Sequence, residues 1–122
     1  SRPIGALYHV PHGLSNAMLL PTVTEYSLSS AFSKYAVAAK AMDVAGFNDS
    51  ENIATKKLIK ELYSLNIDLE VPSPKKYGID ENSFFDNIEK MADQAIASGS
   101  PANNPKVPSK DEIIDLYTKL WH

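Results

Sequence analysis

The sequence contains no cysteine. Disulfide bonds, thiolate metal ligands and a cysteine nucleophile are therefore excluded, and with no recognisable secretion signal we expect a cytoplasmic protein. Arginine is almost absent as well, because Arg2 is the only one among 12 basic residues, and the net charge is −3. Nucleic-acid binding requires a clustered basic face, so this composition predicts no nucleic-acid partner.

Glycine is scarce, with five residues in the chain. These glycines form neither a phosphate-binding loop nor the Gly-x-Ser-x-Gly turn that presents a catalytic serine. Long hydrophobic runs are missing too. No apolar stretch approaches the roughly 20 residues that a membrane span requires, so no membrane association is expected. The remaining composition, 43% apolar and 22% charged over 122 residues, describes one compact domain.

Helical periodicity dominates between the prolines, and no segment alternates apolar and polar residues as a half-buried strand would. We predict an all-α fold of about five helices. The clearest helix start is a capping box, in which Ser109 and Glu112 satisfy each other's free backbone donors. Residues 1–5 carry no helix signal, and longer loops are expected near 66–79 and 99–108. The five predicted helices cover about residues 12–26, 30–42, 51–65, 81–98 and 110–121.

Three histidines are the candidates for metal chemistry: His9, His12 and His122. Pro11 disfavours a helix just before it, so His9 and His12 should not share a helix face. A metal site needs three or four ligands, and residues 1–24 contain no carboxylate. The local sequence thus supplies at most two ligands, and the alternative interpretation is a polar loop that enters a helix. Acidic residues elsewhere cluster at helix starts, where they favour the helix dipole rather than a catalytic pair.

One segment matches a known sequence signature, which is more specific evidence than the physical chemistry of its residues alone. Residues 3–21 read Pro-Ile-Gly-Ala-Leu-Tyr-His-Val-Pro-His-Gly-Leu-Ser-Asn-Ala-Met-Leu-Leu-Pro. This segment resembles the Gly-x-x-x-x-x-Pro-His-Gly…Asn-Ala…Leu-Pro signature of the iron-containing (group III) alcohol dehydrogenases. The Lys-Tyr-Ala of residues 34–36 and the Asn-Asn-Pro-Lys of residues 103–106 are similar to two later motifs of that family. The resemblance spans nearly the whole chain, in order.

The resemblance implies that residues 1–122 form a single helical domain, the C-terminal helical subdomain of the dehydroquinate synthase-like, iron alcohol dehydrogenase fold. The N-terminal nucleotide-binding domain of such enzymes, and the start of their helical domain, would then be absent from this sequence. Family members interconvert small alcohols and aldehydes or ketones by hydride transfer with NAD(H) or NADP(H), and a homo-oligomer is expected. A divalent metal, Fe²⁺ or sometimes Zn²⁺, polarises the substrate oxygen in the cleft between the domains.

Carried over by position, His12 in Pro-His-Gly matches the last of four metal ligands, an Asp and three His. The other three would lie before Ser1, so we expect the 122 residues alone to be inactive and to hold no tightly bound metal. Arg2 stands where many family members have a pocket histidine. A guanidinium stays charged, so Arg2 would bind a carboxylate or phosphate of the substrate rather than take a proton. The alternative is that Arg2 is a frayed terminus. His9 is a second candidate pocket residue.

A second hypothesis is an autonomous helical module without catalysis, which binds a partner or self-associates. A domain separated from its neighbour exposes apolar surface that was formerly covered. We expect that exposed face to include Leu14, Met18 and Leu19 of the first predicted helix.

Overall fold

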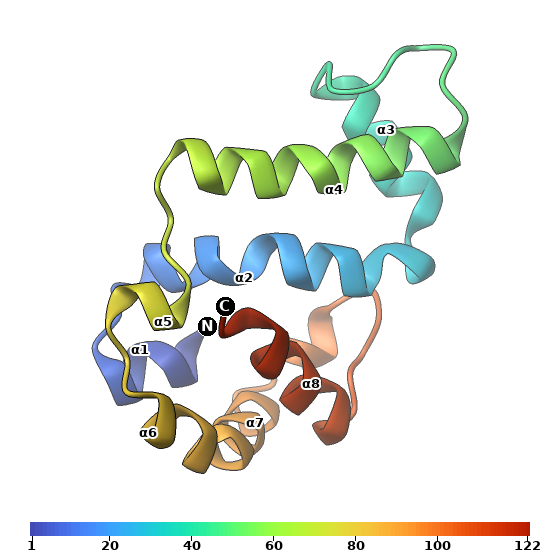
Figure 1. Ribbon diagram of the computed structural model, residues 1–122. Helices are drawn as coiled ribbons and strands as arrows, with labels where there is room; N and C mark the ends of the chain where they lie inside the picture. The colour runs from blue at the N-terminus through green and yellow to red at the C-terminus, as the bar shows by residue number, and fades with distance from the viewer.

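The computed structural model describes all 122 residues and contains no strand, which confirms the all-α prediction. Eight α-helices and two short 3₁₀ helices take the place of the five helices expected (Figure 1). No helix is both long enough and apolar enough to cross a lipid bilayer. In chain order the elements are α1 (Arg2–Tyr8), α2 (His12–Ser27), η1 (Leu28–Ser30), α3 (Phe32–Ala41), α4 (Glu51–Asp68), α5 (Pro74–Tyr77), α6 (Glu81–Asp86), α7 (Ile88–Ala97), η2 (Ser100–Asn103) and α8 (Lys110–Leu120).

Two short helices lie where no helix was predicted, and both have start signals in the sequence. The first, α1, has Pro3 in its first turn, where the fixed backbone angle of proline suits a helix, so residues 1–5 are not irregular as expected. The second, α5, is capped by the hydroxyl of Ser73 and ends at Gly78 in the left-handed conformation. The predicted loop near 66–79 therefore contains a helical turn.

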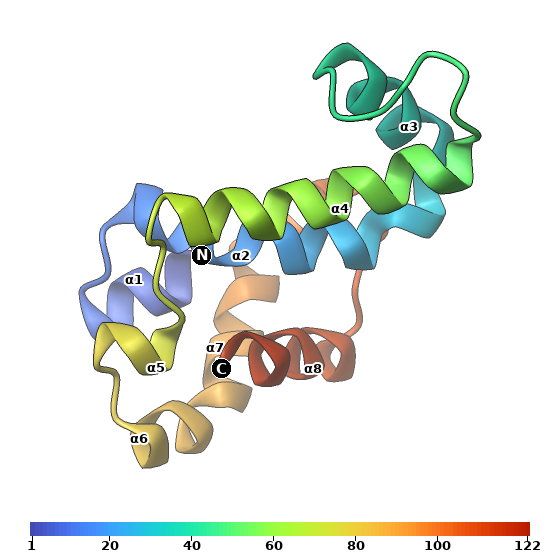
Figure 2. The same ribbon diagram turned by 45° about the horizontal axis from the view of Figure 1, so that its top comes forward.

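The predicted helix over residues 81–98 is in fact two helices, α6 and α7, which meet at Asn87. Asp80 caps α6 as expected. The carbonyl of Ser83 accepts two hydrogen bonds from Asn87, one from its side-chain amide at 2.9 Å and one from its backbone N–H at 3.0 Å. The chain then continues into α7 in a different direction (Figure 2).

The long helices α2 and α4 lie side by side in the middle of the fold (Figures 1 and 2). Helix α3 packs on α4, whereas α1 and α8 pack on α2 and contact α7 as well. Two hydrophobic clusters result, one on each side of this central pair. Helix α2 lies between the two clusters and contacts α1 and α8 on one side and α4 on the other.

Pro21 lies inside α2 and explains one contact between the two central helices. A proline has no N–H, so the carbonyl of Ala17, one turn earlier, loses its helical hydrogen bond. The side-chain amide of Asn66 in α4 donates to that carbonyl at 2.8 Å. The pairing of α2 with α4 therefore satisfies a group that the proline leaves free.

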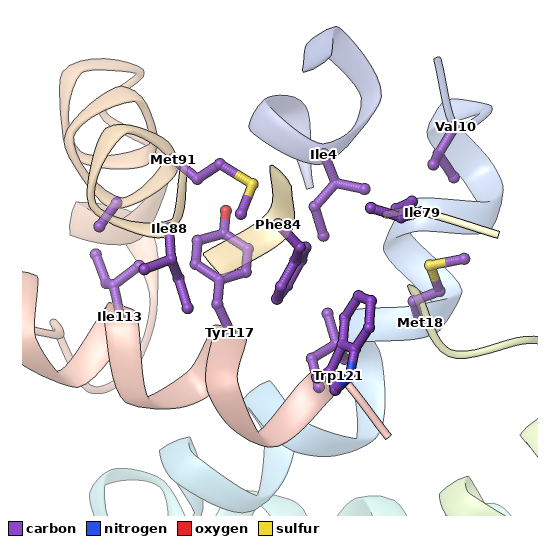
Figure 3. Packing of buried hydrophobic residues seen from close by; sticks show 12 residues of the cluster. Ile4, Val10, Met18, Ile79, Phe84, Ile88, Met91, Ile113, Tyr117 and Trp121 are labelled. Atoms are coloured by element: carbon purple, nitrogen blue, oxygen red, sulfur yellow. The ribbon is translucent and has the colours of Figure 1, made fainter. Parts of the chain in front are cut away.

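The larger core holds 12 buried residues contributed by both ends of the chain. Phe84 of α6 is fully buried in it, with the rings of Trp121 and Phe85 at centroid distances of 5.0 and 5.5 Å. Figure 3 shows side chains from α1, α7 and α8 converging around this ring. The first and last helices are thus held together by one aromatic and aliphatic cluster.

The smaller core lies between α3 and α4 and is built mainly from alanine. Small side chains let the two helix backbones approach closely, but each buries little apolar area. This pair of helices therefore depends on fewer buried carbon atoms than the rest of the domain. Its buried members are Ala36, Ala39, Ala45, Ala54, Leu58 and Leu62.

The prediction of an exposed apolar face on the first long helix is wrong. Met18 is 5% exposed and belongs to the larger core, and Leu14 and Leu19 are half-buried against that core. The reason is that α1 and α8 pack on this side of α2. The most exposed large apolar side chain is instead Phe47, at 89%, in the loop between α3 and α4.

Replacing Phe84 by alanine is expected to lower the free energy of unfolding by about 3–5 kcal/mol, because it leaves a cavity among the surrounding rings. The matched control is Phe85→Ala, since Phe85 is 37% exposed and should cost only about 1–2 kcal/mol. Urea unfolding followed by circular dichroism measures both. Equal losses for the two variants would contradict this description of the core.

Candidate functional site

A cavity of about 430 Å³ opens where the start of α1 meets α2, the end of α7, the loop before α8 and α8 itself. Its wall combines apolar side chains such as Leu19, Val23 and Leu116 with the polar side chains of Arg2 and His12. No aspartate or glutamate lines it, although the chain contains 15 acidic residues. The cavity is therefore a partly apolar space without any negative side chain.

One face of α2 forms a continuous wall of this cavity. His12, Asn16, Leu19, Val23 and Tyr26 follow one another at intervals of three or four residues. That spacing places side chains on the same side of a helix. The wall is thus polar at the start of α2, apolar in its middle and aromatic near its end.

His12 is the first residue of α2, and the short link from α1 positions it. His9 ends α1 in the left-handed conformation at φ 55°, and Pro11 precedes α2 as its N-cap. Between them Val10 is buried in the larger core. A Cβ added to Gly5 would lie 3.2 Å from the carbonyl of Val10, so glycine permits this close approach. The turn separates the two histidines, which confirms that they do not share a helix face.

The exposed ring of His12 has one hydrogen-bond partner within the chain. Asn16 Nδ2 lies 3.3 Å from His12 Nε2 and donates to it when the ring is neutral. His9 is exposed and does not line the cavity, and His122 is exposed at the C-terminus. No group of three or more His, Asp or Glu side chains comes together in the molecule. These residues therefore bring one imidazole to the cavity and do not form a complete metal site.

Arg2 lines the same cavity as His12, so two of the three predicted site residues come together there. The Arg2 side chain is exposed. All three ion pairs of the molecule use lysines, and Arg2 takes part in none of them. Its guanidinium is therefore available to a molecule that enters the cavity.

Tyr26 ties the far end of the α2 wall to α8. Its hydroxyl donates to Glu112 Oε2 at 2.8 Å, and burial together with this bond raises the pKa of Tyr26 to about 12. Glu112 also accepts from the backbone N–H of Ser109, whose hydroxyl accepts from the Glu112 N–H, as the capping box predicts. The bond from Ser109, with that from Tyr26, holds the pKa of Glu112 below its ordinary value.

Two further residues hold the loop before α8 against α2. Asn104 Nδ2 donates to Ser27 Oγ at 2.6 Å and to the carbonyl of Lys106 at 2.7 Å. The ammonium of Lys106 lies 4.4 Å from the centre of the Tyr26 ring, within cation–π range. Because Asn104 also lines the cavity, the Asn-Asn-Pro-Lys segment fixes part of its wall.

Sequence reasoning missed Tyr26 and Tyr117 as cavity residues. Tyr26 lies about four helical turns after His12, so helical spacing from His12 would have found it. Tyr117 comes from α8 and is 3% exposed, and burial raises its pKa to about 12. No local pattern shows that α8 closes a cavity begun by α1 and α2.

Comparisons with known proteins agree on one family. The model for the Fe-containing alcohol dehydrogenase family, C-terminal, matches residues 1–121. An NADPH-dependent butanol dehydrogenase of Clostridium saccharobutylicum is 30% identical over 97% of this chain. A lactaldehyde reductase of Escherichia coli is 29% identical over 99% of it. The crystal structure of a 1,3-propanediol oxidoreductase matches 98% of the chain with a TM-score of 0.87 and 28% identity.

The chain spans less than a third of the length of these relatives. It covers 30% of the butanol dehydrogenase, 31% of the lactaldehyde reductase and 30% of the propanediol oxidoreductase chain. The activities in their names therefore belong to much longer proteins.

Replacing Glu112 by glutamine is expected to lower the thermal midpoint more at pH 7 than at pH 2.5. The pKa of Glu112 is lower in the folded protein than in the unfolded chain. Its stabilisation is thus complete above the unfolded-state pKa and is lost as the pH falls through the folded-state pKa. Calorimetry at both pH values measures the difference. Glu61→Gln, at an exposed position on α4, is the control for loss of charge. A loss for Glu112→Gln that is the same at both pH values would contradict this assignment.

Proposed function

Because the chain belongs to the Fe-containing alcohol dehydrogenase family, whose C-terminal part it matches, we propose that it forms one wall of the active site of an NAD(P)-dependent alcohol dehydrogenase. Such an enzyme interconverts small alcohols and aldehydes or ketones by hydride transfer. The observation that carries the proposal is the position of His12. The histidine of the Pro-His-Gly motif lines a cavity that is otherwise apolar, neutral or basic.

We assign to His12 the role of one metal ligand, with Fe²⁺ or Zn²⁺ as the metal. One imidazole is too few for a metal site, and these residues contain no group of three or more His, Asp or Glu side chains that would complete one. The remaining ligands and the nucleotide-binding domain must therefore come from outside the 122 residues. In this assignment a metal bound at His12 Nε2 would take the lone pair that accepts from Asn16, so the metal would replace this hydrogen bond.

The α2 wall would bind the substrate in a defined direction. The polar start of α2 would face the reacting oxygen, and Leu19 and Val23 would contact the carbon chain. Apolar contacts of this kind exclude water and fix orientation without taking part in the chemistry. The use of NAD(H) or NADP(H) belongs to the same proposal and is supported by one relative that is named as NADPH-dependent. The homo-oligomeric state expected from the family resemblance is also part of this proposal.

In the protein expressed from its complete gene, His12→Ala is expected to lower both bound metal and NAD(P)-dependent alcohol oxidation by more than about tenfold. Metal analysis and a nicotinamide absorbance assay measure the two losses. His122→Ala is the matched control, because His122 is exposed and lies outside the cavity. Full metal content and activity in His12→Ala would refute the ligand assignment.

The 122 residues produced alone are expected to fold, to be inactive and to retain no metal after dialysis, because they supply a single imidazole. Circular dichroism, metal analysis and the same activity assay test the three points. One tightly bound Fe or Zn per chain would show that the ligand set is different from the one proposed.

A further inference from the structure

The charge around the cavity has one sign. Arg2 is the only lysine or arginine on its wall, and no carboxylate balances it. The neighbouring polar side chains are neutral or weakly basic: the amides of Asn16 and Asn104, the ring of His12 and several hydroxyls. Among these 122 residues, the wall of the cavity therefore carries positive and no negative side-chain charge, which favours an anion.

The guanidinium of Arg2 has no protein partner. Its five N–H donors are suited to a carboxylate, which they can bind through two parallel hydrogen bonds. Each of the three ion pairs of the molecule joins an aspartate to a lysine, so none involves Arg2. The single arginine of the sequence therefore lies on the wall of this cavity, and none of the lining residues of these 122 is an aspartate or glutamate.

The hydroxyl of Tyr117 is a second polar group on this wall. Tyr117 is 3% exposed as a residue, but no buried side-chain oxygen or nitrogen of the molecule lacks a hydrogen-bond partner, so this hydroxyl reaches solvent. Figure 3 shows the Tyr117 ring extending from α8 with its hydroxyl on the side of Met91.

We propose that this cavity selects a substrate that carries a carboxylate, namely an aliphatic hydroxy acid or the corresponding aldehyde acid, with Arg2 binding the carboxylate. Arg2 is the only lysine or arginine on the wall, and one guanidinium balances the charge of a monoanion but not that of a phosphate dianion. The apolar side chains of Leu19, Val23 and Leu116 contact the carbon chain between the two polar ends. The inference rests on the proposed dehydrogenase function and specifies its substrate class.

The test uses the protein from its complete gene and two substrates that differ in one group, 5-hydroxypentanoate and pentane-1,5-diol. The ratio of their kcat/KM values in NAD(P)-dependent oxidation should favour the acid by at least about tenfold, the effect of about 1.4 kcal/mol. Pentanoate should also inhibit more strongly than pentyl phosphate. A preference for the diol, or for the phosphate, would overturn the assignment to a carboxylate.

Variants at Arg2 separate charge from shape. Arg2→Met should bring the ratio of acid to diol close to one, whereas Arg2→Lys should retain part of the preference because it keeps the charge. Lys56→Met is the control, since it removes a positive charge from an exposed position on α4 outside the cavity. An unchanged ratio in Arg2→Met would overturn the role of Arg2.

Failure of this inference and failure of the proposed function give different results. Oxidation of the diol without any preference for the acid would leave the dehydrogenase function intact and refute the substrate class. If neither compound is oxidised, the proposed function fails for these substrates. Titration with pentanoate, followed by the NMR signal of Arg2 Nε–H, then decides whether the cavity binds a carboxylate. An Arg2 signal that does not shift with pentanoate would refute carboxylate binding. A signal that shifts with pentanoate but not with pentane-1,5-diol would support it.

Discussion

The domain depends on a hydrogen bond that a proline makes necessary. Pro21 leaves the carbonyl of Ala17 without its helical partner, and Asn66 supplies a donor from α4. An unsatisfied buried carbonyl would cost about 1–3 kcal/mol. The contact therefore fixes α4 against α2, and through α4 it attaches the alanine-rich core to the aromatic one. Because α2 also forms one wall of the cavity, the same contact supports the candidate site.

The shape and the chemistry of the cavity have different origins. Its shape follows from packing, because the stripe on α2 is held against α8 by Tyr26 and Glu112 and against the preceding loop by Asn104. Its chemistry comes from residues near the start of the chain, Arg2 and His12, which α1 and the turn after it bring to the polar end of that stripe. A rigid apolar scaffold thus presents two polar side chains that are free to bind other molecules.

Much of the helical architecture could be predicted because its signals are local. The hydroxyl of Ser109 and the carboxylate of Asp80 cap the helices expected to start there. Burial is harder to predict from spacing, since Met42 follows the buried Ala39 by three residues at the end of α3 and is nevertheless 52% exposed. The family motif predicted a site role for His12, which lines the cavity, but the sequence did not distinguish Arg2, which lines it, from His9, which does not. That distinction depends on a left-handed turn and on contacts between distant helices, which no local pattern encodes.

The position of the two chain ends in one core also determines when this domain can fold during synthesis. Ile4 and Trp121 are packed in the same cluster, so that cluster cannot be completed until the last helix has left the ribosome. At about 5–20 residues per second, Ile4 emerges roughly 10 s before Trp121. The helical hairpin of α3 and α4 needs only neighbouring residues and can form during this interval. The face of α2 that packs against α8 therefore stays uncovered in the nascent chain until α8 has left the ribosome.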